Sequence, residues 1–105
     1  MPTKEEHFGK GLILYGQNKH EEAIAELQKA FELDPSFADA HLAIGHALHK
    51  LNRLPEAVQA IQKAIALDPQ EPMYHTSLST VYRDMRMIPE AEEEMAIASQ
   101  LQRRT

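Results

Sequence analysis

The chain repeats itself with a period of 34 residues, and this periodicity limits its possible folds more than any other feature of the sequence. The stretch from Ala38 to Glu71 matches the residues before it and, more loosely, the residues after it. The residues that recur unchanged in the preceding copy include His41, Gly45, Leu48, Ala57, Lys63, Ala64, Leu67, Asp68 and Pro69. A fixed period of this size is typical of a stacked-repeat architecture, in which each unit buries its apolar face against the next.

Each copy holds two helical patterns. In the first copy His7, Gly11 and Leu14 stand at i, i+4 and i+7, so they share one stripe of a helix expected over residues 5–16. A second stripe runs to Leu33, where proline at the second position after it stops the helix. The other copies predict helices at 38–51, 55–67, 72–85 and from 89 nearly to the end of the chain. Linkers of a few residues favour antiparallel hairpins.

Small residues are expected where the two helices of a hairpin approach most closely. These positions hold glycine or serine in the first helix of each copy and alanine in the second, and they are Gly11, Gly45, Ser79, Ala23, Ala57 and Ala91. A large side chain at any of them would hold the two helices apart.

The composition excludes several classes of function. The formal charge of −5 leaves no basic stripe to neutralise phosphates, so neither nucleic acid nor an anionic membrane is an expected partner. The absence of cysteine removes disulfides and cysteine-based zinc sites. The first residues are polar and acidic, and no apolar run approaches the length of a bilayer. We therefore expect a soluble, cytoplasmic protein.

The repeat resembles the tetratricopeptide repeat, whose pattern is W-x2-L-G-x2-Y, then A-x3-F, then P over 34 residues. The second copy fits this pattern throughout once histidine replaces the tryptophan, and its matching residues are His41, Ile44, Gly45, Leu48, Ala57, Ile61 and Pro69. The first copy departs from the pattern at Lys10, and the third departs from it at Ser79 and Arg103.

The resemblance covers residues 4–105 and implies an all-α fold. The expected architecture is an α-solenoid of three stacked helix-turn-helix repeats, at 4–37, 38–71 and 72–105, forming a right-handed superhelix. Many members of this family hold a peptide or helix of another protein in a concave groove lined by the first helix of each repeat. The resemblance therefore implies a protein–protein interaction module or scaffold that needs no cofactor.

The family pattern can be carried onto this chain to predict its groove. The positions that would face the groove are Glu5, Phe8, Leu12, Tyr15, Asp39, Leu42, His46, His49, Lys50, Met73, Thr76, Ser77, Thr80, Arg83 and Asp84. Phe8, Leu12 and Tyr15 form a second apolar face on their helix. Two interpretations of this face stay open: it binds a partner, or the N-terminal residues or the curvature of the stack bury it.

One known subfamily, the chaperone adaptors, clamps an acidic C-terminal tail with two lysines, two asparagines and an arginine. By repeat phase, the residues at those positions here are Phe8, Leu12, Ala43, Met73 and Ser77. None of them carries the required charge or amide. We therefore expect a partner other than a chaperone tail.

The histidines form two groups. His7, His41 and His75 share one phase, where the family packs an aromatic ring between the two helices of a hairpin, so they are expected to be core residues with a hydrogen-bonded tip. His46 and His49 stand at i and i+3 on the groove face. With Asp84 they could ligate a metal ion, but no zinc motif supports this alternative. We expect no resident metal.

No arrangement of residues indicates catalysis. The sequence has no Ser-His-Asp order, no glycine-rich phosphate loop and no isolated pair of carboxylates. The acids at Glu92, Glu93 and Glu94 are typical of a solvated helix face. The chain is therefore not expected to be an enzyme.

A structural role is the main alternative to partner binding. In this family an additional helix often covers the last repeat, and the sequence up to Thr105 holds none. The last helix carries Glu92 and Ser99 where earlier copies are apolar. An apolar strip remains and would join two copies about a twofold axis, and it consists of Met95, Ile97 and Leu101. This hypothesis predicts a homodimer or a homo-oligomeric scaffold.

Overall fold

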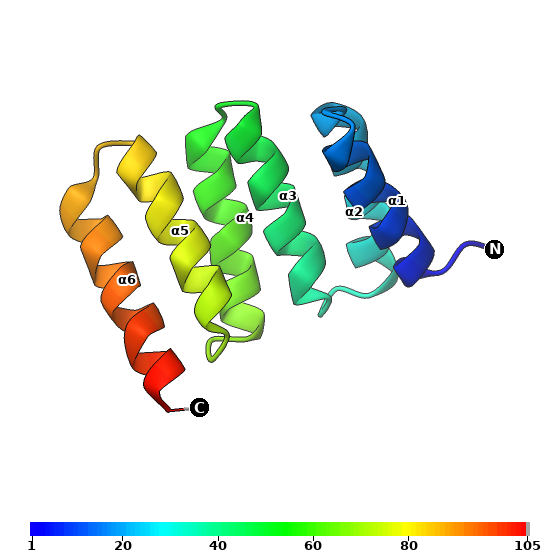
Figure 1. The fold of residues 1–105 in the computed structure, drawn as a ribbon. Helices are drawn as coiled ribbons and strands as arrows, with labels where there is room; N and C mark the ends of the chain where they lie inside the picture. The colour runs from blue at the N-terminus through cyan, green and yellow to red at the C-terminus, as the bar shows by residue number, and fades with distance from the viewer. Residues whose placement is uncertain (105) are drawn as a thin grey trace.

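The computed structural model describes residues 1–104, which form six helices joined by short turns (Figure 1). The helices are α1 (Lys4–Gly16), α2 (His20–Leu33), α3 (Ala38–Lys50), α4 (Leu54–Leu67), α5 (Pro72–Asp84) and α6 (Ile88–Arg103). Each lies within a residue or two of its predicted range where the sequence set one. Helices α4 and α6 begin one residue before the prolines that were expected to start them. Thr105, the last residue of the expected third repeat, lies outside the described residues.

The helices pack in the order of the chain. Hairpins α1–α2, α3–α4 and α5–α6 stack side by side, so that α2 contacts α3 and α4 contacts α5 (Figure 1). Helices α1, α3 and α5 also touch along one side of the stack. This arrangement confirms the predicted all-α fold of three stacked helical hairpins. Within residues 1–104, no helix is long and apolar enough to cross a membrane.

The turn inside each hairpin has the same geometry. One residue per turn takes a positive φ, and these residues are Asn18 (64°), Asn52 (60°) and Arg86 (64°), spaced 34 apart. The following N–H bonds at 2.9 Å to the carbonyl five residues earlier, as in Lys19 to Leu14. Asparagine visits this left-handed region more readily than arginine does. The period of the sequence is therefore reproduced in the backbone of the turns.

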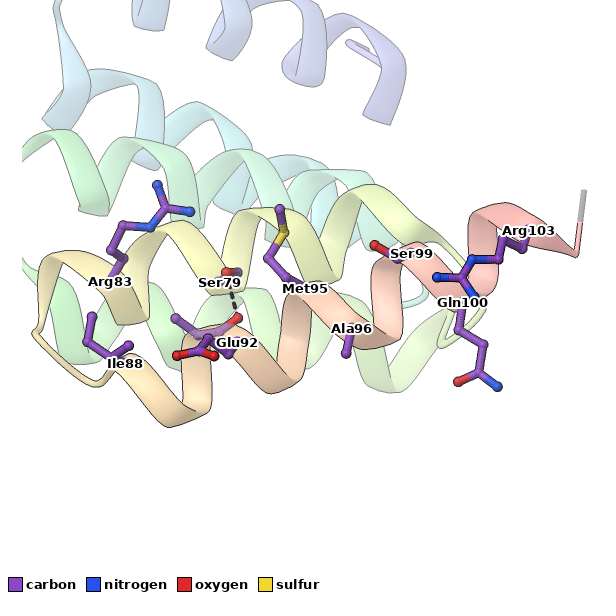
Figure 2. Close-up of a pocket in the computed structure, with 10 residues that line it drawn as sticks. Ser79, Arg83, Ile88, Glu92, Met95, Ala96, Ser99, Gln100 and Arg103 are labelled. Atoms are coloured by element: carbon purple, nitrogen blue, oxygen red, sulfur yellow. Dashed lines mark hydrogen bonds between the residues drawn. The ribbon is translucent and has the colours of Figure 1, made fainter.

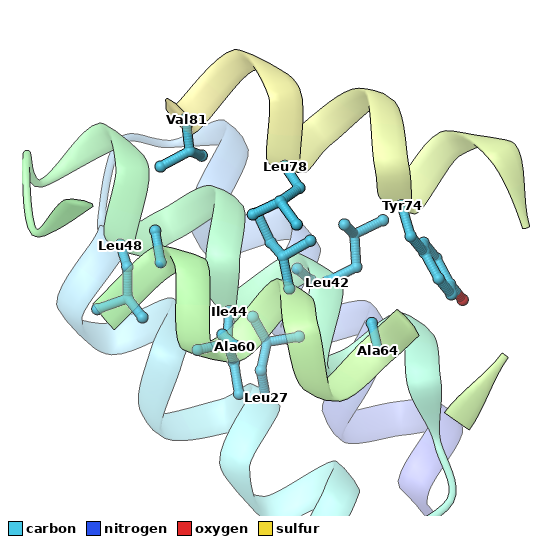
Figure 3. Packing of buried hydrophobic residues seen from close by; sticks show 12 residues of the cluster. Leu27, Leu42, Ile44, Leu48, Ala60, Ala64, Tyr74, Leu78 and Val81 are labelled. Carbon is cyan, nitrogen blue, oxygen red and sulfur yellow. The ribbon is translucent and has the colours of Figure 1, made fainter. Parts of the chain in front are cut away.

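The core is centred on the middle hairpin and reaches into both neighbours (Figure 3). Ile61 of α4 is fully buried against Gly45 of α3, where an added Cβ would lie 2.6 Å from Ile61 Cγ1. The first hairpin repeats this contact, because a Cβ on Gly11 would lie 2.7 Å from Leu27 Cγ. These two glycines allow the closest approach of the helices, as the sequence predicted.

Candidate functional site

The predicted groove lies along the side where α1, α3 and α5 stand next to one another (Figure 1). Its two halves differ in chemistry. The half between α1 and α3 is mainly apolar, whereas the half between α3 and α5 is crossed by polar side chains that bond to one another.

The apolar half is built by α1 and the start of α3. The ring of Phe8 lies 4.9 Å from that of Phe37, and the ring of Tyr15 lies 5.0 Å from that of His20. Both Phe8 and Tyr15 are half-buried, while Leu12 between them is 44% exposed. Phe37, rather than the N-terminal residues, therefore covers one end of this stripe, and Leu12 remains open to solvent.

The polar half contains three hydrogen bonds that join α3 to α5. They are Tyr74 Oη to Asp39 Oδ1 at 2.6 Å, His46 Nε2 with Ser77 Oγ at 3.0 Å, and His49 Nε2 with Asp84 Oδ2 at 2.5 Å. Burial and the bond to Asp39 raise the pKa of Tyr74, so its hydroxyl stays protonated and donates. Burial, followed by the positive fields of His49 and Lys50, lowers the pKa of His46. We call these three bonds the α3–α5 ladder.

The equivalent positions one repeat earlier contain no such ladder. The residues 34 positions before those of the ladder lie on α1 and α3 and cannot form the same three hydrogen bonds. They are Glu5, Leu12, Tyr15, Ala40, Ala43 and Lys50. The same backbone therefore presents a mainly apolar surface, with Glu5 and Lys50 exposed, in the first half of the groove and hydrogen-bonded polar groups in the second. The repeat pattern does not predict the ladder, because each of its three hydrogen bonds joins residues of two different repeats.

The other predicted groove residues vary in accessibility. The prediction that Leu42 faces the groove is wrong, because its side chain is only 6% exposed and belongs to the core. Met73 is 52% exposed. The hydroxyls of Thr76 and Thr80 donate to carbonyls of their own helix, at Pro72 and Thr76, so they offer only acceptor capacity to a partner. The remaining charged positions of the predicted groove are exposed, and they are Glu5, Lys50 and Arg83.

The in-phase histidines of the two outer hairpins, His7 and His75, lie between the two helices of their own hairpin, as predicted. In the two outer hairpins they bond to buried or half-buried carboxylates, with His7 Nδ1 2.8 Å from Glu26 Oε2 and His75 Nδ1 2.8 Å from Glu94 Oε1. The bond from His7 is the main cause that lowers the pKa of Glu26 to about 2, and Lys29 and Lys10 add to it.

The middle hairpin replaces this carboxylate with Ala60, and its His41 instead stacks on Phe31 of α2 at 4.6 Å. Burial lowers the pKa of His41. The carboxylate partners were not predicted from the sequence. The signal was present, because Glu26 and Glu94 share one phase of the repeat just as the histidines do.

The structure does not assemble a metal site from the groove histidines. His46 bonds to Ser77 and His49 bonds to Asp84, which divides the proposed ligand set between two separate contacts. Among residues 1–104, no group of three or more histidine or carboxylate side chains is placed to hold a metal ion.

A second surface lies at the C-terminal end of the stack, on the outer side of α5 and α6 (Figure 2). We call it the α6 end face. It is hollowed by about 710 Å³, and its lining residues are Ser79, Arg83, Ile88, Ala91, Glu92, Met95, Ala96, Ser99, Gln100 and Arg103. Ser79 Oγ donates to the carbonyl of Ala91 at 2.7 Å (Figure 2).

The predicted apolar strip on the last helix is only partly exposed. Met95 is 41% exposed and lies in the hollow, but Leu101 is buried at 9% and Ile97 is not among the lining residues. The assignment of Leu101 to an exposed strip was therefore wrong. It turns toward the core because α6 places it on the same side as the buried Ala91 and Ala98. Glu92 and Ser99 do line the end face, as expected.

Comparison with known families identifies the class of this fold. A family profile described as a TPR repeat matches residues 11–52, and one described as a tetratricopeptide repeat matches residues 38–71. Together these matches span 11–71, which is more than half of the chain. The chain belongs to the tetratricopeptide repeat family. No match was found among curated proteins.

Solved structures share the fold. The chain described as MamA MSR-1 C2 is 26% identical with a TM-score of 0.88, and the match covers 97% of this chain and 59% of that one. The first such domain of Spaghetti (RPAP3), bound to an HSP90 peptide, is 18% identical with a TM-score of 0.91, covering 98% and 82%. The type III secretion translocator chaperone SycD of Yersinia enterocolitica is 19% identical with a TM-score of 0.90, covering 93% and 74%. The present chain thus spans about three-fifths of the length of the MamA chain.

Proposed function

We propose that the chain is a protein–protein interaction module that holds a peptide or helix of a partner protein in the groove of α1, α3 and α5. The observation that carries the proposal is the exposed side chain of Leu12, which lies between the half-buried Phe8 and Tyr15 and holds on α1 the repeat position that His46 of the polar α3–α5 ladder holds on α3. An apolar anchor next to fixed polar groups is the usual composition of a protein-binding surface.

The groove favours a segment with two different sides. An apolar side chain of the partner would pack on Leu12, and donors would meet the acceptor oxygens of Thr76 and Thr80. The cations Lys50 and Arg83 stand at the C-terminal ends of α3 and α5, so an acidic residue of the partner would be favoured at that rim. The proposed partner is therefore an amphipathic protein segment with an acidic end.

The proposed partner is not a chaperone tail. The first domain of RPAP3 has this fold and was solved with an HSP90 peptide, but at 18% identity it supports the fold alone. The five clamp positions here carry neither a cation nor a side-chain amide, and three of them hold Phe8, Leu12 and Met73. A tail carboxylate would find no partner there.

The test compares a groove variant with a variant of similar exposure outside the groove. Leu12→Glu places a charge on the apolar anchor, whereas Ile13→Glu changes the neighbouring residue, which is 63% exposed on the outer side of α1. Affinity capture followed by quantitative binding should show at least a tenfold loss with Leu12→Glu and no loss with Ile13→Glu. Circular dichroism checks that both fold. A captured partner that binds Leu12→Glu as tightly as the unchanged chain would overturn the proposal.

A further inference from the structure

Helices α1 and α6, at the two ends of the described stack, correspond to the two halves of an interface that residues 1–104 already form twice. Between hairpins, the second helix of one repeat packs against the first helix of the next, as α2 does on α3 and α4 does on α5. Helices α3 and α5 each bury residues at three positions that correspond by the 34-residue period. All six residues are at most 7% exposed, and they are Ala40, Ile44, Ala47, Tyr74, Leu78 and Val81.

Helix α1 presents the same three positions to solvent. They hold Glu6, Lys10 and Ile13, and Ile13 is 63% exposed, the largest value among the exposed large hydrophobic side chains other than Met1. We call this surface the α1 end face. These three positions have the spacing i, i+4 and i+7 of an interface stripe, but no helix among the described residues packs against them.

The opposite end carries the matching half. Glu92, Met95 and Ser99 of α6 stand where α4 has Val58, Ile61 and Ile65. Ile61 is fully buried, while Met95 is 41% exposed. Ser79 replaces the glycine that lets Ile61 settle on α3, and Figure 2 shows Met95 between Ser79 and Ser99 on the α6 end face.

The internal interfaces set the register in which the two end faces would meet. The printed contacts are the Phe31 and His41 rings at 4.6 Å and Gln62 Nε2 to Tyr82 Oη at 3.4 Å, and they describe two antiparallel helices. Moving the first contact forward by two repeat periods places Ser99 against His7 of a second copy, and moving the second contact forward by one period places Ala96 against Leu14.

The same register brings residues of complementary chemistry together. Met95 would meet Ile13, Arg103 would meet Glu6, and Glu92 would meet Gln17 of the second copy. These are an apolar pair, an ion pair and an amide–carboxylate pair. The remaining cation, Lys10, lies over Ser99 and is already 3.5 Å from Glu26 of its own copy. None of the three named pairs joins two groups of like charge.

We propose that the α6 end face binds the α1 end face of a second copy, so that copies join head to tail and continue the helical stack. Such a contact uses two different surfaces and leaves one of each free, so it forms open chains rather than a closed dimer. Because two of the three pairs are polar and the rim is exposed, the association is weak and falls with added salt. It leaves Leu12 and the groove uncovered.

A mixing experiment tests the direction of the contact. Ile13→Glu disables the α1 end face and Met95→Glu disables the α6 end face, and both side chains are exposed enough to change without unfolding the chain. In sedimentation velocity at about 0.01 M salt, where screening is weak, the unchanged chain should form oligomers that grow with concentration. Each variant alone should be monomeric. Their equimolar mixture should form a one-to-one dimer, because each variant keeps the face that the other has lost.

Two further measurements complete the test. Arg103→Glu should weaken self-association at least fivefold and remove most of its salt dependence, while Leu12→Glu should leave it unchanged. A chain that stays monomeric up to about 1 mM, a concentration that detects even very weak contacts, would overturn the proposal. A mixture that stays monomeric, or an Ile13→Glu variant that still dimerises, would also overturn it, since the second result indicates a twofold α6 contact. The groove proposal stands or falls separately, on Leu12→Glu.

Discussion

The middle hairpin and the two outer hairpins share one sequence pattern but are stabilised differently. Eight of the 13 residues of α3 are buried, whereas Gly11 is the only buried residue of α1. The outer hairpins pair a histidine with a carboxylate, and the middle one has Ala60 at that position and stacks His41 on a neighbouring ring. A repeat that is covered on both sides can be apolar throughout, while a repeat with one open side retains polar groups that must be satisfied within it.

The largest expected effect comes from filling the close contact in the middle hairpin. Gly45→Leu places a side chain where even a Cβ would lie 2.6 Å from Ile61, in the fully packed part of the core. We expect a loss of about 3 kcal/mol in the free energy of unfolding. Urea denaturation followed by circular dichroism measures it.

The matched change in the outer hairpin is Ser79→Leu, which should cost less because Met95 opposite is exposed and able to move. Gly9→Ala, with open space around its Cβ position, is the control and should not destabilise. Equal losses at positions 45 and 79 would contradict the distinction between covered and open hairpins.

The second effect is the pH dependence of the first hairpin. The bond from His7 holds the pKa of Glu26 at about 2, below its usual value of 4.5. Since the folded-state pKa is depressed, this stabilisation is complete above about pH 4.5 and is lost as the pH falls toward 2. We expect a decrease of about 1–3 kcal/mol over that window, measured as urea midpoints between pH 6 and pH 2.

Glu26→Ala makes the first hairpin resemble the middle one and separates this contribution from other acids. The variant should be less stable at pH 6, because it leaves His7 Nδ1 without its carboxylate, and its loss of stability on acidification should be smaller. An unchanged acid response would mean that the pair does not set it.

A smaller effect is expected from the α3–α5 ladder, which the junction between α1 and α3 lacks. Ser77→Ala removes the partner of the half-buried His46 ring and should cost about 1 kcal/mol. Asp84→Ala should cost less than about 1 kcal/mol, because the side chain of Asp84 is 53% exposed. Thermal unfolding of both variants checks the order, and a larger loss with Asp84→Ala would reverse our assignment.

The smallest effect concerns the turns. Arg86 of the third hairpin has φ of 64°, where the middle hairpin uses Asn52 at 60°. Arg86→Asn should stabilise by about 0.5 kcal/mol, because asparagine tolerates this conformation better. The reverse change, Asn52→Arg, should destabilise by a similar amount. Unfolding midpoints that move in the same direction for both variants would show that side-chain contacts, rather than backbone strain, dominate.

Most of the fold could be read from the sequence, because its signals are local and repeated. The 34-residue period, the apolar spacing within each helix and the prolines near the helix ends predicted the six helices to within a residue or two, apart from the start of the second helix and the end of the last, for which the sequence set no exact residue. The glycines at 11 and 45 marked the close approaches correctly. These features depend on residues a few positions apart, so a repeat reveals them more than once.

The candidate sites depended on contacts between repeats, which the local pattern does not contain. The sequence placed Leu42 in the groove and Leu101 on an exposed strip, but the packing of neighbouring helices buries both. It could not show that His46 and His49 bond to residues 31 and 35 positions later. Whether a side chain is a core residue, a bonded pair or an open surface is decided by the helix that lies against it, and only the assembled stack supplies that helix.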